Sequence, residues 1–592
     1  MSNEQILIFA ILAVTLVLFA WGRWRYDLVA LTAMSAVLAG GLVSPSEAFS
    51  GFGHTAVITV AAVLIISQAL KNAGVVDVAS AYLLPHTSNA MVHIALLTAV
   101  VTFFSAFMNN VGALALLLPV AIATAKEHQR SPAMILMPVA FGSILGGMST
   151  MIGTPPNIII ANYRADITGQ AFSMFDFSPI GSVIAITGLV FISLIGWRLI
   201  PKQRLQQNTA EQLFEVSSYL TEVKVMANSP LIDTAVNQVE SLQSDDIGVV
   251  GIASGKRIAL NTNPNYHLKQ DDILILRGDP VTLQTKFADA NLEFQTASGK
   301  TFDDLTQGEL SLTECVMTAA SPIVGRDVSY LRRRTANAVA VIGLAREGQL
   351  IRKRLRNHSF AVGDVLLLQC EKAFVNDMLT ELSLLPLAER GIKMGQQRRV
   401  LIALAIFIAA IVIGALNLMP MAGAFIVAII MYSVMGFLPG KDVYRNVDWP
   451  IIVLLGGMIP VGRALESTGA TDLIANNIVS LTHGLPTYVV LTLILVCTMF
   501  LSDIINNAAT ALVMAPISVG IANQLGVNID PFLMAVAIGA SCAFLTPIGH
   551  QSNTLVMGPG GYQFGDYWRM GLPLEIIITV ISVPLILIVW PL

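Results

Sequence analysis

The chain has 592 residues, of which 55% are hydrophobic and only 12% are charged, and its mean hydropathy is +0.70. This composition excludes an ordinary soluble protein and is typical of a chain that crosses a membrane several times. The net charge of -4 argues against a nucleic-acid partner, and the four cysteines have no spacing that predicts a disulfide or a metal site.

Residues 1–204 are expected to form a first membrane repeat, because their apolar runs are long enough to cross the hydrocarbon core of a bilayer. The run 91–125 is interrupted by Asn109-Asn110, and we expect it to enter the membrane and return as a re-entrant hairpin. The run 132–161 contains Gly153-Thr154-Pro155-Pro156, where two prolines remove backbone donors and glycine relaxes the dihedral angles. A helix that unwinds in its middle is therefore predicted there.

After this first repeat, the pattern changes to short strand-like runs that are separated by charged turns. The stretch is duplicated, since Pro230 and Asp272 in the first copy recur as Pro322 and Asp364, at the same spacing, in the second. Each acid is followed by a run of aliphatic residues of the kind that forms a buried strand. We expect two small α+β modules inserted between the membrane repeats, with the boundaries 205–298 and 299–392.

Residues 393–592 repeat the plan of the first membrane repeat. An apolar run, 485–523, is interrupted by Asn506-Asn507, and a second run, 531–556, is predicted to be a broken helix. The break at Thr546-Pro-Ile-Gly-His-Gln-Ser-Asn553 aligns with Thr150-Met-Ile-Gly-Thr-Pro-Pro-Asn157 in the first repeat. A polar pair followed by a broken helix, once in each half, is how a secondary transporter builds a site near the middle of the bilayer.

Basic residues predict the orientation of these segments, because they gather on the cytoplasmic side of a membrane. Most of them, including Arg23, Lys71, Lys126 and Arg398, fall on one side, whereas Arg164 falls on the other. This assignment gives each repeat five crossings plus one re-entrant hairpin, and an odd number of crossings inverts the second repeat relative to the first. It also makes the insert cytoplasmic and puts both termini outside, in a multi-pass protein of the cell membrane.

The asparagine pairs are candidates for a binding site. An asparagine side chain supplies a carbonyl oxygen that can coordinate a cation such as Na⁺ and an amide nitrogen that can donate to an anion. Such amides are costly to bury in a bilayer without partners, so two pairs at corresponding places predict a function. The candidate residues at the hairpins are Asn109, Asn110, Asn506 and Asn507.

The two helix breaks supply the rest of the predicted site. Unwound backbone exposes carbonyls, which bind cations, and helix N-termini, which attract anions. The further residues expected to bind the anion are Thr154, Asn157, His550, Gln551, Ser552 and Asn553. The further residues expected at the cation are Thr150, Gly153, Thr546 and Gly549.

Asp503 is a carboxylate inside an apolar run, shortly before Asn506. An acid within the membrane is by default a functional candidate. Three roles are open to it: to carry a coupling proton, to balance a bound cation, or to cap the hairpin helix. The first half has Ala106 at the aligned position, so the two ends of the site are expected to differ chemically.

The asparagine turns, together with Gly146-Gly-Met-Ser-Thr-Met-Ile-Gly-Thr-Pro-Pro-Asn157, resemble the divalent anion/sodium symporter family of the ion-transporter superfamily. The resemblance covers the two membrane repeats. It implies a homodimeric elevator-type carrier of di- and tricarboxylates or sulfate that is coupled mostly to Na⁺. Within the family, the dicarboxylate carriers have Ser-Asn-Thr at each hairpin tip, whereas this chain has Asn109-Asn110-Val111 and Asn506-Asn507-Ala508.

The Asn-Asn turns, the segment Thr546–Asn553 and the tail Gly558-Pro-Gly-Gly-Tyr-x-Phe-Gly-Asp566 are similar to the sulfate-type branch of that family. The resemblance implies Na⁺ at Asn110 and Gly153 in one half and at Asn507 and Thr546 in the other, with sulfate between the two turns.

Each copy of the insert resembles the TrkA-C domain, through stretches such as Ser321-Pro-Ile-Val-Gly325 and Gly363-Asp-x-Leu-Leu-Leu368. This second resemblance implies dimerisation and a small ligand, sometimes a nucleotide, through which the insert regulates the membrane part.

Other functions stay open at this point. The same fold could carry di- or tricarboxylates, and H⁺ could replace Na⁺ as the coupling ion. A protein of another class, a membrane receptor that senses a ligand without net flux, is also compatible with the insert. An enzyme is not expected, because the sequence contains no nucleophile–base or metal constellation.

Overall fold

The structure is a computed structural model of the chain. The residues that it describes are 1–21, 23–75, 89–205, 220–235, 248–254, 257–260, 266–277, 292–295, 310–335, 338–346, 349–351, 358–387, 397–416, 418–438, 443, 447–482 and 484–592. The chain folds into two compact units. One unit combines residues 1–206 with 389–592, and the other consists of residues 207–388.

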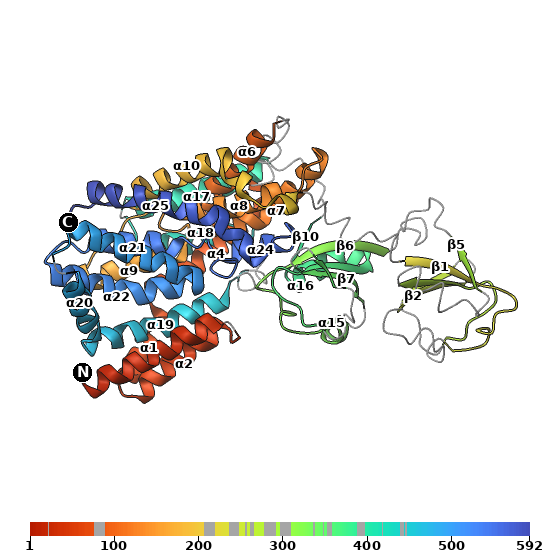
Figure 1. The fold of residues 1–592 in the computed structure, drawn as a ribbon, viewed down its shortest axis with the longest axis horizontal. Coiled ribbons are helices and arrows are strands. Elements are labelled where there is room, and N and C mark those ends of the chain that lie inside the picture. Colours follow the sequence, from red (N-terminus) through yellow and green to blue (C-terminus); the bar gives the residue numbers. More distant parts are fainter. Residues whose placement is uncertain are drawn as a thin grey trace. The chain divides into compact units, whose positions relative to one another are not determined.

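The unit that combines the two ends of the chain is helical (Figure 1). Its helices before the insert are α1 (Asn3–Trp21), α2 (Tyr26–Ala39), α3 (Pro45–Ser50), α4 (Thr55–Ala73), α6 (Ala90–Ser105), α7 (Asn110–Glu127), α8 (Ala133–Gly147), α9 (Pro155–Thr168), α10 (Ser178–Leu194) and α11 (Lys202–Leu205). Those after it are α17 (Gln397–Ala415), α18 (Met421–Val434), α19 (Trp449–Ser467), α20 (Ala470–Leu481), α21 (Thr487–Ile504), α22 (Asn507–Leu525), α23 (Asp530–Ser541), α24 (Gln551–Met557) and α25 (Tyr567–Val589).

Within the described residues, seven helical segments are long and apolar enough to cross a membrane. Many side chains on these helices, such as Val14, Ile408 and Val580, are apolar and yet exposed on the isolated chain. Exposed aliphatic residues along long helices are stable in a hydrocarbon environment and costly in water. The protein is therefore a multi-pass membrane protein, as the composition predicts.

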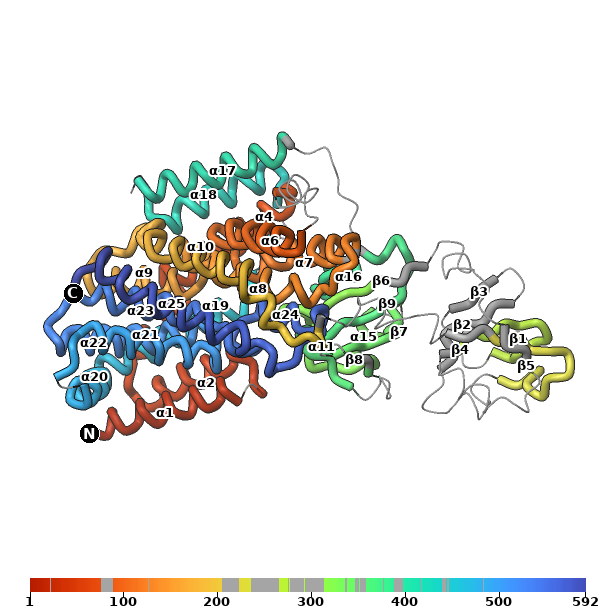
Figure 2. Tube along the Cα trace, turned by 45° about the horizontal axis from the view of Figure 1, so that its top comes forward, coloured from red at the N-terminus to blue at the C-terminus, as the bar shows by residue number. Residues whose placement is uncertain are grey.

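Helices from the two halves of the sequence interleave in this unit. α9 packs against α22 and α23, α10 packs against α25, and α2 packs against α19. The helices α10 and α25 lie side by side in both views (Figure 1, Figure 2). One close approach occurs twice. A Cβ atom on Gly181 of α10 would come within 2.2 Å of the Met148 carbonyl oxygen, and one on Gly571 of α25 within 2.2 Å of the Phe544 carbonyl oxygen. Each glycine therefore lets one helix pack directly on an unwound backbone segment.

The other unit contains two antiparallel sheets. The first has the strand order β3-β2-β4-β1-β5, and the second has the order β10-β6-β9-β7-β8. Their strands are β1 (Leu220–Val225), β2 (Gly248–Ser254), β3 (Arg257–Leu260), β4 (Ile273–Arg277), β5 (Leu292–Gln295), β6 (Leu310–Met317), β7 (Ala340–Arg346), β8 (Gln349–Leu350), β9 (Val365–Glu371) and β10 (Leu384–Pro386). In the second sheet the short helices α15 (Val328–Arg334) and α16 (Val375–Glu381) supply residues to the buried core.

The two sheets correspond strand for strand. Read from opposite ends, both orders place the strands in the same sequence, and both contain one irregularity in register. The irregularity lies between Val249 and Gly251 in the first sheet and between Val341 and Gly343 in the second. The duplicated sequence thus has a duplicated backbone, and its likeness to the TrkA-C domain stays a prediction.

Candidate functional site

In both hairpins a helix ends and a new one begins at the asparagine pair. The first asparagine of each pair caps the new helix, because its side-chain oxygen accepts a hydrogen bond from a free backbone N–H. Asn109 Oδ1 accepts from Val111 N at 3.1 Å, and Asn506 Oδ1 accepts from Ala508 N at 2.9 Å. Each of these oxygens therefore already has one partner, and the amide nitrogens of Asn109 and Asn506 are left to donate to a ligand.

The second asparagine of each pair is buried and is held by a serine on the preceding helix. The Ser105 hydroxyl lies 2.8 Å from the Asn110 amide, and the Ser502 hydroxyl lies 2.9 Å from the Asn507 amide. Sequence analysis did not single out these serines. Their signal was present, since Ser105 precedes Asn110 at the spacing at which Ser502 precedes Asn507.

The serines also tie the hairpins to the next helix. The Ser105 hydroxyl donates to the Ser143 carbonyl on α8 at 2.6 Å, and the Ser502 hydroxyl donates to the Ala540 carbonyl on α23 at 2.7 Å. Both hairpins are thus fixed to a broken helix by the same set of contacts.

The unwound segments after α8 and α23 are stabilised by side chains from within each half. Asn157 Nδ2 donates to the Thr150 carbonyl at 2.9 Å, and Asn553 Nδ2 donates to the Thr546 carbonyl at 3.1 Å. The Thr546 hydroxyl donates to the Asp503 carbonyl at 2.7 Å, and Thr150 bonds in the same way to the Ala106 carbonyl. All four side chains hold the backbone in shape. The hydroxyls of Thr150 and Thr546, predicted at the cation, are engaged in this way, so these two residues would contact a cation through backbone carbonyls. Asn157 and Asn553, predicted at the anion, use their amide nitrogens here, and Asn553 Oδ1 is buried without a hydrogen-bond partner among the described residues.

The next helices, α9 and α24, begin at aligned residues with nearly the same backbone. Thr154 has φ −140° and ψ 143°, and His550 has φ −138° and ψ 135°. His550 caps α24, because its Nδ1 accepts from Ser552 N at 3.0 Å. The Thr154 hydroxyl is buried and has no hydrogen-bond partner among the described residues. An unpaired buried hydroxyl costs stability, so this atom is available to a ligand.

Two side-chain contacts join the halves at the site. His550 Nε2 lies 3.1 Å from the Asn110 amide, and the Ser143 hydroxyl lies 3.1 Å from the Ser552 hydroxyl. The predicted residues His550 and Ser552 are thereby brought against the first hairpin. Since Nδ1 of a neutral His550 accepts from a backbone N–H, its proton must lie on Nε2, which makes Nε2 a donor.

The amide of Asn110 is surrounded by oxygen atoms. It makes the most hydrogen bonds when Nδ2 donates to the carbonyls of Gly153 at 3.0 Å and Ser143 at 3.2 Å, and Oδ1 accepts from the Nε2–H of His550 at 3.1 Å. The predicted pair Asn110 and Gly153 is thus in contact. With the amide turned over, Oδ1 would join these two carbonyls in a group of oxygens of the kind that binds a hard cation.

Gly549 and Gln551 have different surroundings. Gly549 N donates to the Thr546 hydroxyl at 3.1 Å, and a Cβ atom there would come within 2.8 Å of the Ser502 carbonyl oxygen. Gly549 therefore lets the unwound segment pack against the second hairpin. Gln551 is within hydrogen-bond reach of the Tyr26 hydroxyl on α2, a contact that the sequence did not predict.

Asp503 faces the unwound backbone and a second acid. Its Oδ1 accepts from Leu545 N at 2.9 Å, its Oδ2 is buried without a hydrogen-bond partner among the described residues, and its carboxylate interacts electrostatically with that of Glu575. Glu575, on α25, accepts from Phe544 N at 3.4 Å. Sequence analysis missed Glu575, although it is an isolated acid in an apolar run, as Asp503 is.

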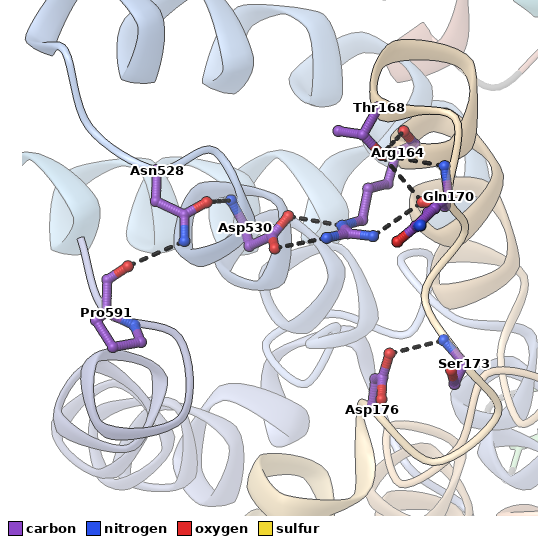
Figure 3. Close-up of polar contacts among 8 residues, drawn as sticks. All are labelled: Arg164, Thr168, Gln170, Ser173, Asp176, Asn528, Asp530 and Pro591. Carbon is purple, nitrogen blue, oxygen red and sulfur yellow. Dashed lines mark hydrogen bonds and ion pairs between the residues drawn. The ribbon is translucent and has the colours of Figure 1, made fainter.

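The basic residue that lies closest in sequence to the first helix break, Gly153–Pro156, is already paired. Arg164, on α9, forms a two-pronged ion pair with Asp530 at the start of α23, with distances of 2.7 and 2.9 Å (Figure 3). It also donates to the Gln170 carbonyl at 2.9 Å. A guanidinium engaged in this way joins the halves and is not available to an anionic substrate.

Comparisons with known proteins identify a class of function. The model of the family described as "Citrate transporter" matches residues 16–539 and 493–592. An uncharacterized transporter of Synechocystis is 30% identical over 100% of this chain and 98% of its own length. An uncharacterized transporter of Escherichia coli is 28% identical over 100% of both chains. Sodium/sulfate cotransporter 1 of Chlamydomonas reinhardtii is 20% identical over 97% of this chain and 88% of its own length.

Proposed function

The chain belongs to the citrate transporter family, and from this membership we propose that it is a symporter that couples the uptake of sulfate, or of a related small divalent oxyanion, to Na⁺. The name of the Chlamydomonas relative, a sodium/sulfate cotransporter, supports both the ion and the anion. Membership in the divalent anion/sodium symporter branch is part of this proposal. So is the assignment of the individual site residues.

The observation that carries the proposal is the oxygen-rich environment of Asn110. The carbonyls of Gly153 and Ser143 converge on its amide from two directions, at 3.0 and 3.2 Å. Na⁺ prefers such neutral or anionic oxygens, and here it would be bound without any buried acid. In the second half the corresponding ligands would be the Asn507 side chain and the Thr546 carbonyl.

The anion would lie between the two hairpin turns. Neutral donors are available there from the amide nitrogens of Asn109 and Asn506 and from the unpaired Thr154 hydroxyl. The Nε2–H of His550, which lies against the Asn110 amide in this structure, would be a further donor. The helices α7 and α22 begin at these turns, and their N-termini contribute partial positive charge. A divalent oxyanion needs many such donors, and two bound cations would offset its charge without a fixed arginine or lysine.

Alternating access would follow from the inverted repeats. We propose that each repeat contributes five crossings and one hairpin, and that the hairpins and broken helices move together as an elevator within a homodimer. The insert would lie in the cytoplasm and regulate the movement through a small ligand, with both termini on the outside. The boundaries 1–204, 205–298, 299–392 and 393–592 belong to the same proposal.

A second candidate is favoured by one observation, the description of the matching family as a citrate transporter. The same hairpins and the same Na⁺ ligands could bind a di- or tricarboxylate. The transported anion would then be different, but transport would still be coupled to Na⁺. The coupling ion and the anion must therefore be tested in separate experiments.

The decisive experiment is uptake of radiolabelled sulfate into proteoliposomes that contain the purified full-length protein. Replacement of external Na⁺ by choline should abolish accumulation. Asn110→Ala and Asn507→Ala should each lower uptake by about tenfold or more, because each removes a ligand of a charged group. Asn477→Ala is the matched control, since Asn477 on α20 is exposed and its amide donates to the Leu473 carbonyl in its own helix.

Three results would change the proposal. Normal uptake by both hairpin variants would refute the assignment of the site. Competition by succinate or citrate that is stronger than competition by sulfate or thiosulfate would favour the second candidate. Binding of labelled sulfate without accumulation would favour a receptor over a carrier.

A further inference from the structure

The contact between His550 and Asn110 connects the anion region to the cation region. His550 Nδ1 accepts from Ser552 N at 3.0 Å, so Nε2 of the neutral ring carries the proton. That Nε2–H donates to Asn110 Oδ1 at 3.1 Å when the Asn110 amide has its most favourable orientation. In this state His550 has no free donor, because its two ring nitrogens are both engaged.

A cation beside Gly153 requires the opposite orientation of the same amide. Only the oxygen of Asn110 can coordinate a cation, and Nδ2 now occupies the place next to the Gly153 and Ser143 carbonyls. Rotation of the amide by half a turn exchanges the two atoms with little movement of the rest of the side chain. Oδ1 then faces the two carbonyls, and Nδ2 faces His550 Nε2 at about the 3.1 Å that separates Oδ1 from Nε2 before the rotation.

This rotation changes what His550 can do. After the rotation, two donors face one another, the Nδ2–H of Asn110 and the Nε2–H of His550. No acceptor lies between these two donors. An unpaired donor in a buried site is costly, and a shared anionic oxygen is the acceptor that both could use.

We propose that cation binding at Asn110 turns over the Asn110 amide and thereby releases the His550 Nε2–H to bind the anion. The inference rests on the proposed function and deepens it, because it names the pair of side chains through which the cation and the anion are coupled. His550 is then a residue that donates to the anion only when the cation is bound. Without the cation, the same donor is occupied by Asn110.

Two substitutions separate the donor role of His550 from its role as a helix cap. His550→Asn keeps an acceptor at the position of Nδ1, and asparagine is among the best N-cap residues, but it lacks the far donor. His550→Gln keeps a donor near the position of Nε2 and loses the cap. A purely structural role would make the glutamine variant the more damaged of the two in every measurement.

His54 provides a matched control for these variants. It caps α4 in the same way, since its Nδ1 accepts from Ala56 N at 3.2 Å, and its Nε2 lies 3.0 Å from Asp166. His54→Asn therefore removes a histidine with the same pair of contacts from a different helix start. It should leave both ion affinities unchanged.

The measurement is ligand affinity of the purified full-length protein, from thermal stabilisation or calorimetry, with Na⁺ titrated alone and sulfate titrated in Na⁺ or in choline. In the wild type, Na⁺ should tighten sulfate binding. In His550→Asn this tightening should fall about tenfold, the value of one hydrogen bond to a charged group. Na⁺ titrated alone should bind the variant as tightly as the wild type or up to about fivefold more tightly, because no donor competes for Asn110 Oδ1.

The opposite signs of these two effects distinguish the switch from general damage. His550→Gln should keep more of the coupling than His550→Asn. Undiminished coupling in His550→Asn, or weaker Na⁺ binding by it, would overturn the inference while the proposed function stood. A wild-type protein whose sulfate affinity did not respond to Na⁺ would overturn the proposed function and this inference with it.

Discussion

The two halves of the membrane unit share one framework but differ at the residues that face their partner. Ser105 and Asn110 in the first half form the same contacts as Ser502 and Asn507 in the second. The starts of the broken helices are also held in matching fashion, each by a residue of the other half. Arg164 holds Asp530 at the start of α23, and the Tyr562 hydroxyl donates to the Ala133 carbonyl at the start of α8.

Two positions break this symmetry. His550 reaches across to Asn110, whereas the aligned Thr154 has a hydroxyl without a partner in the described residues. Behind the turns, the second half has the acids Asp503 and Glu575.

The first half has Ala106 and Ala185 at the corresponding places. Ala106 follows Ser105 as Asp503 follows Ser502, and Ala185 follows Gly181 at the spacing at which Glu575 follows Gly571. The duplicated contacts therefore maintain the fold, and the differences give each half its own chemistry.

The largest effect is expected when one of the two contacts that hold the starts of α23 and α8 is removed. Arg164→Ala leaves the buried carboxylate of Asp530 without its partner and should lower the stability by about 3 kcal/mol. Tyr562→Phe removes two neutral hydrogen bonds, one donated to the Ala133 carbonyl and one accepted from Met137 N, and should cost about 2 kcal/mol. Thermal unfolding in detergent would measure both. An equal loss for the two variants would mean that the ion pair is no stronger than the hydroxyl contacts at the other end.

Asp503→Ala makes the second half resemble the first at this position. The change removes the acceptor of Leu545 N and leaves Glu575 without its neighbour, so we expect a loss of about 2 kcal/mol in stability. The control is Asp472→Ala on α20, where the acid is exposed and the loss should stay below about 0.5 kcal/mol. A stable Asp503→Ala variant would show that the second unwound segment, like the first, needs no acid.

The smallest expected effect has the opposite sign. Thr154→Val replaces an unpaired buried hydroxyl by a methyl group of the same shape, so the empty protein should be unchanged or about 1 kcal/mol more stable. Sulfate affinity, measured by calorimetry in Na⁺, should nevertheless fall about threefold to tenfold if the hydroxyl binds the anion. A variant that is less stable and binds sulfate normally would assign Thr154 to the framework instead.

Residue types alone were enough to predict a multi-pass membrane protein, because long apolar runs with few charges have no other stable environment. They also located the starts of α7 and α22 at the asparagine pairs and the start of α9 at Pro155. The preceding helices α6 and α8 end several residues before these positions, and α21 ends two residues before Asn506. Asparagine, glycine and proline each impose a local backbone preference that needs no distant contact. Ser105, Ser502 and Glu575 were missed because the role of a single serine or glutamate in an apolar run cannot be predicted before its contact partner is known.

Only the tertiary structure shows that the two asparagines of each turn have different roles. Residue type alone does not distinguish Asn109 from Asn110, and it does not say what the aligned residues Thr154 and His550 contact. Folding points one asparagine at its own helix and the other at Gly153, and it brings His550 from the far half within 3.1 Å of Asn110. Local propensity acts over a few residues, whereas the identity of a buried side chain's partner depends on which helices pack together. That choice is made by the tertiary structure.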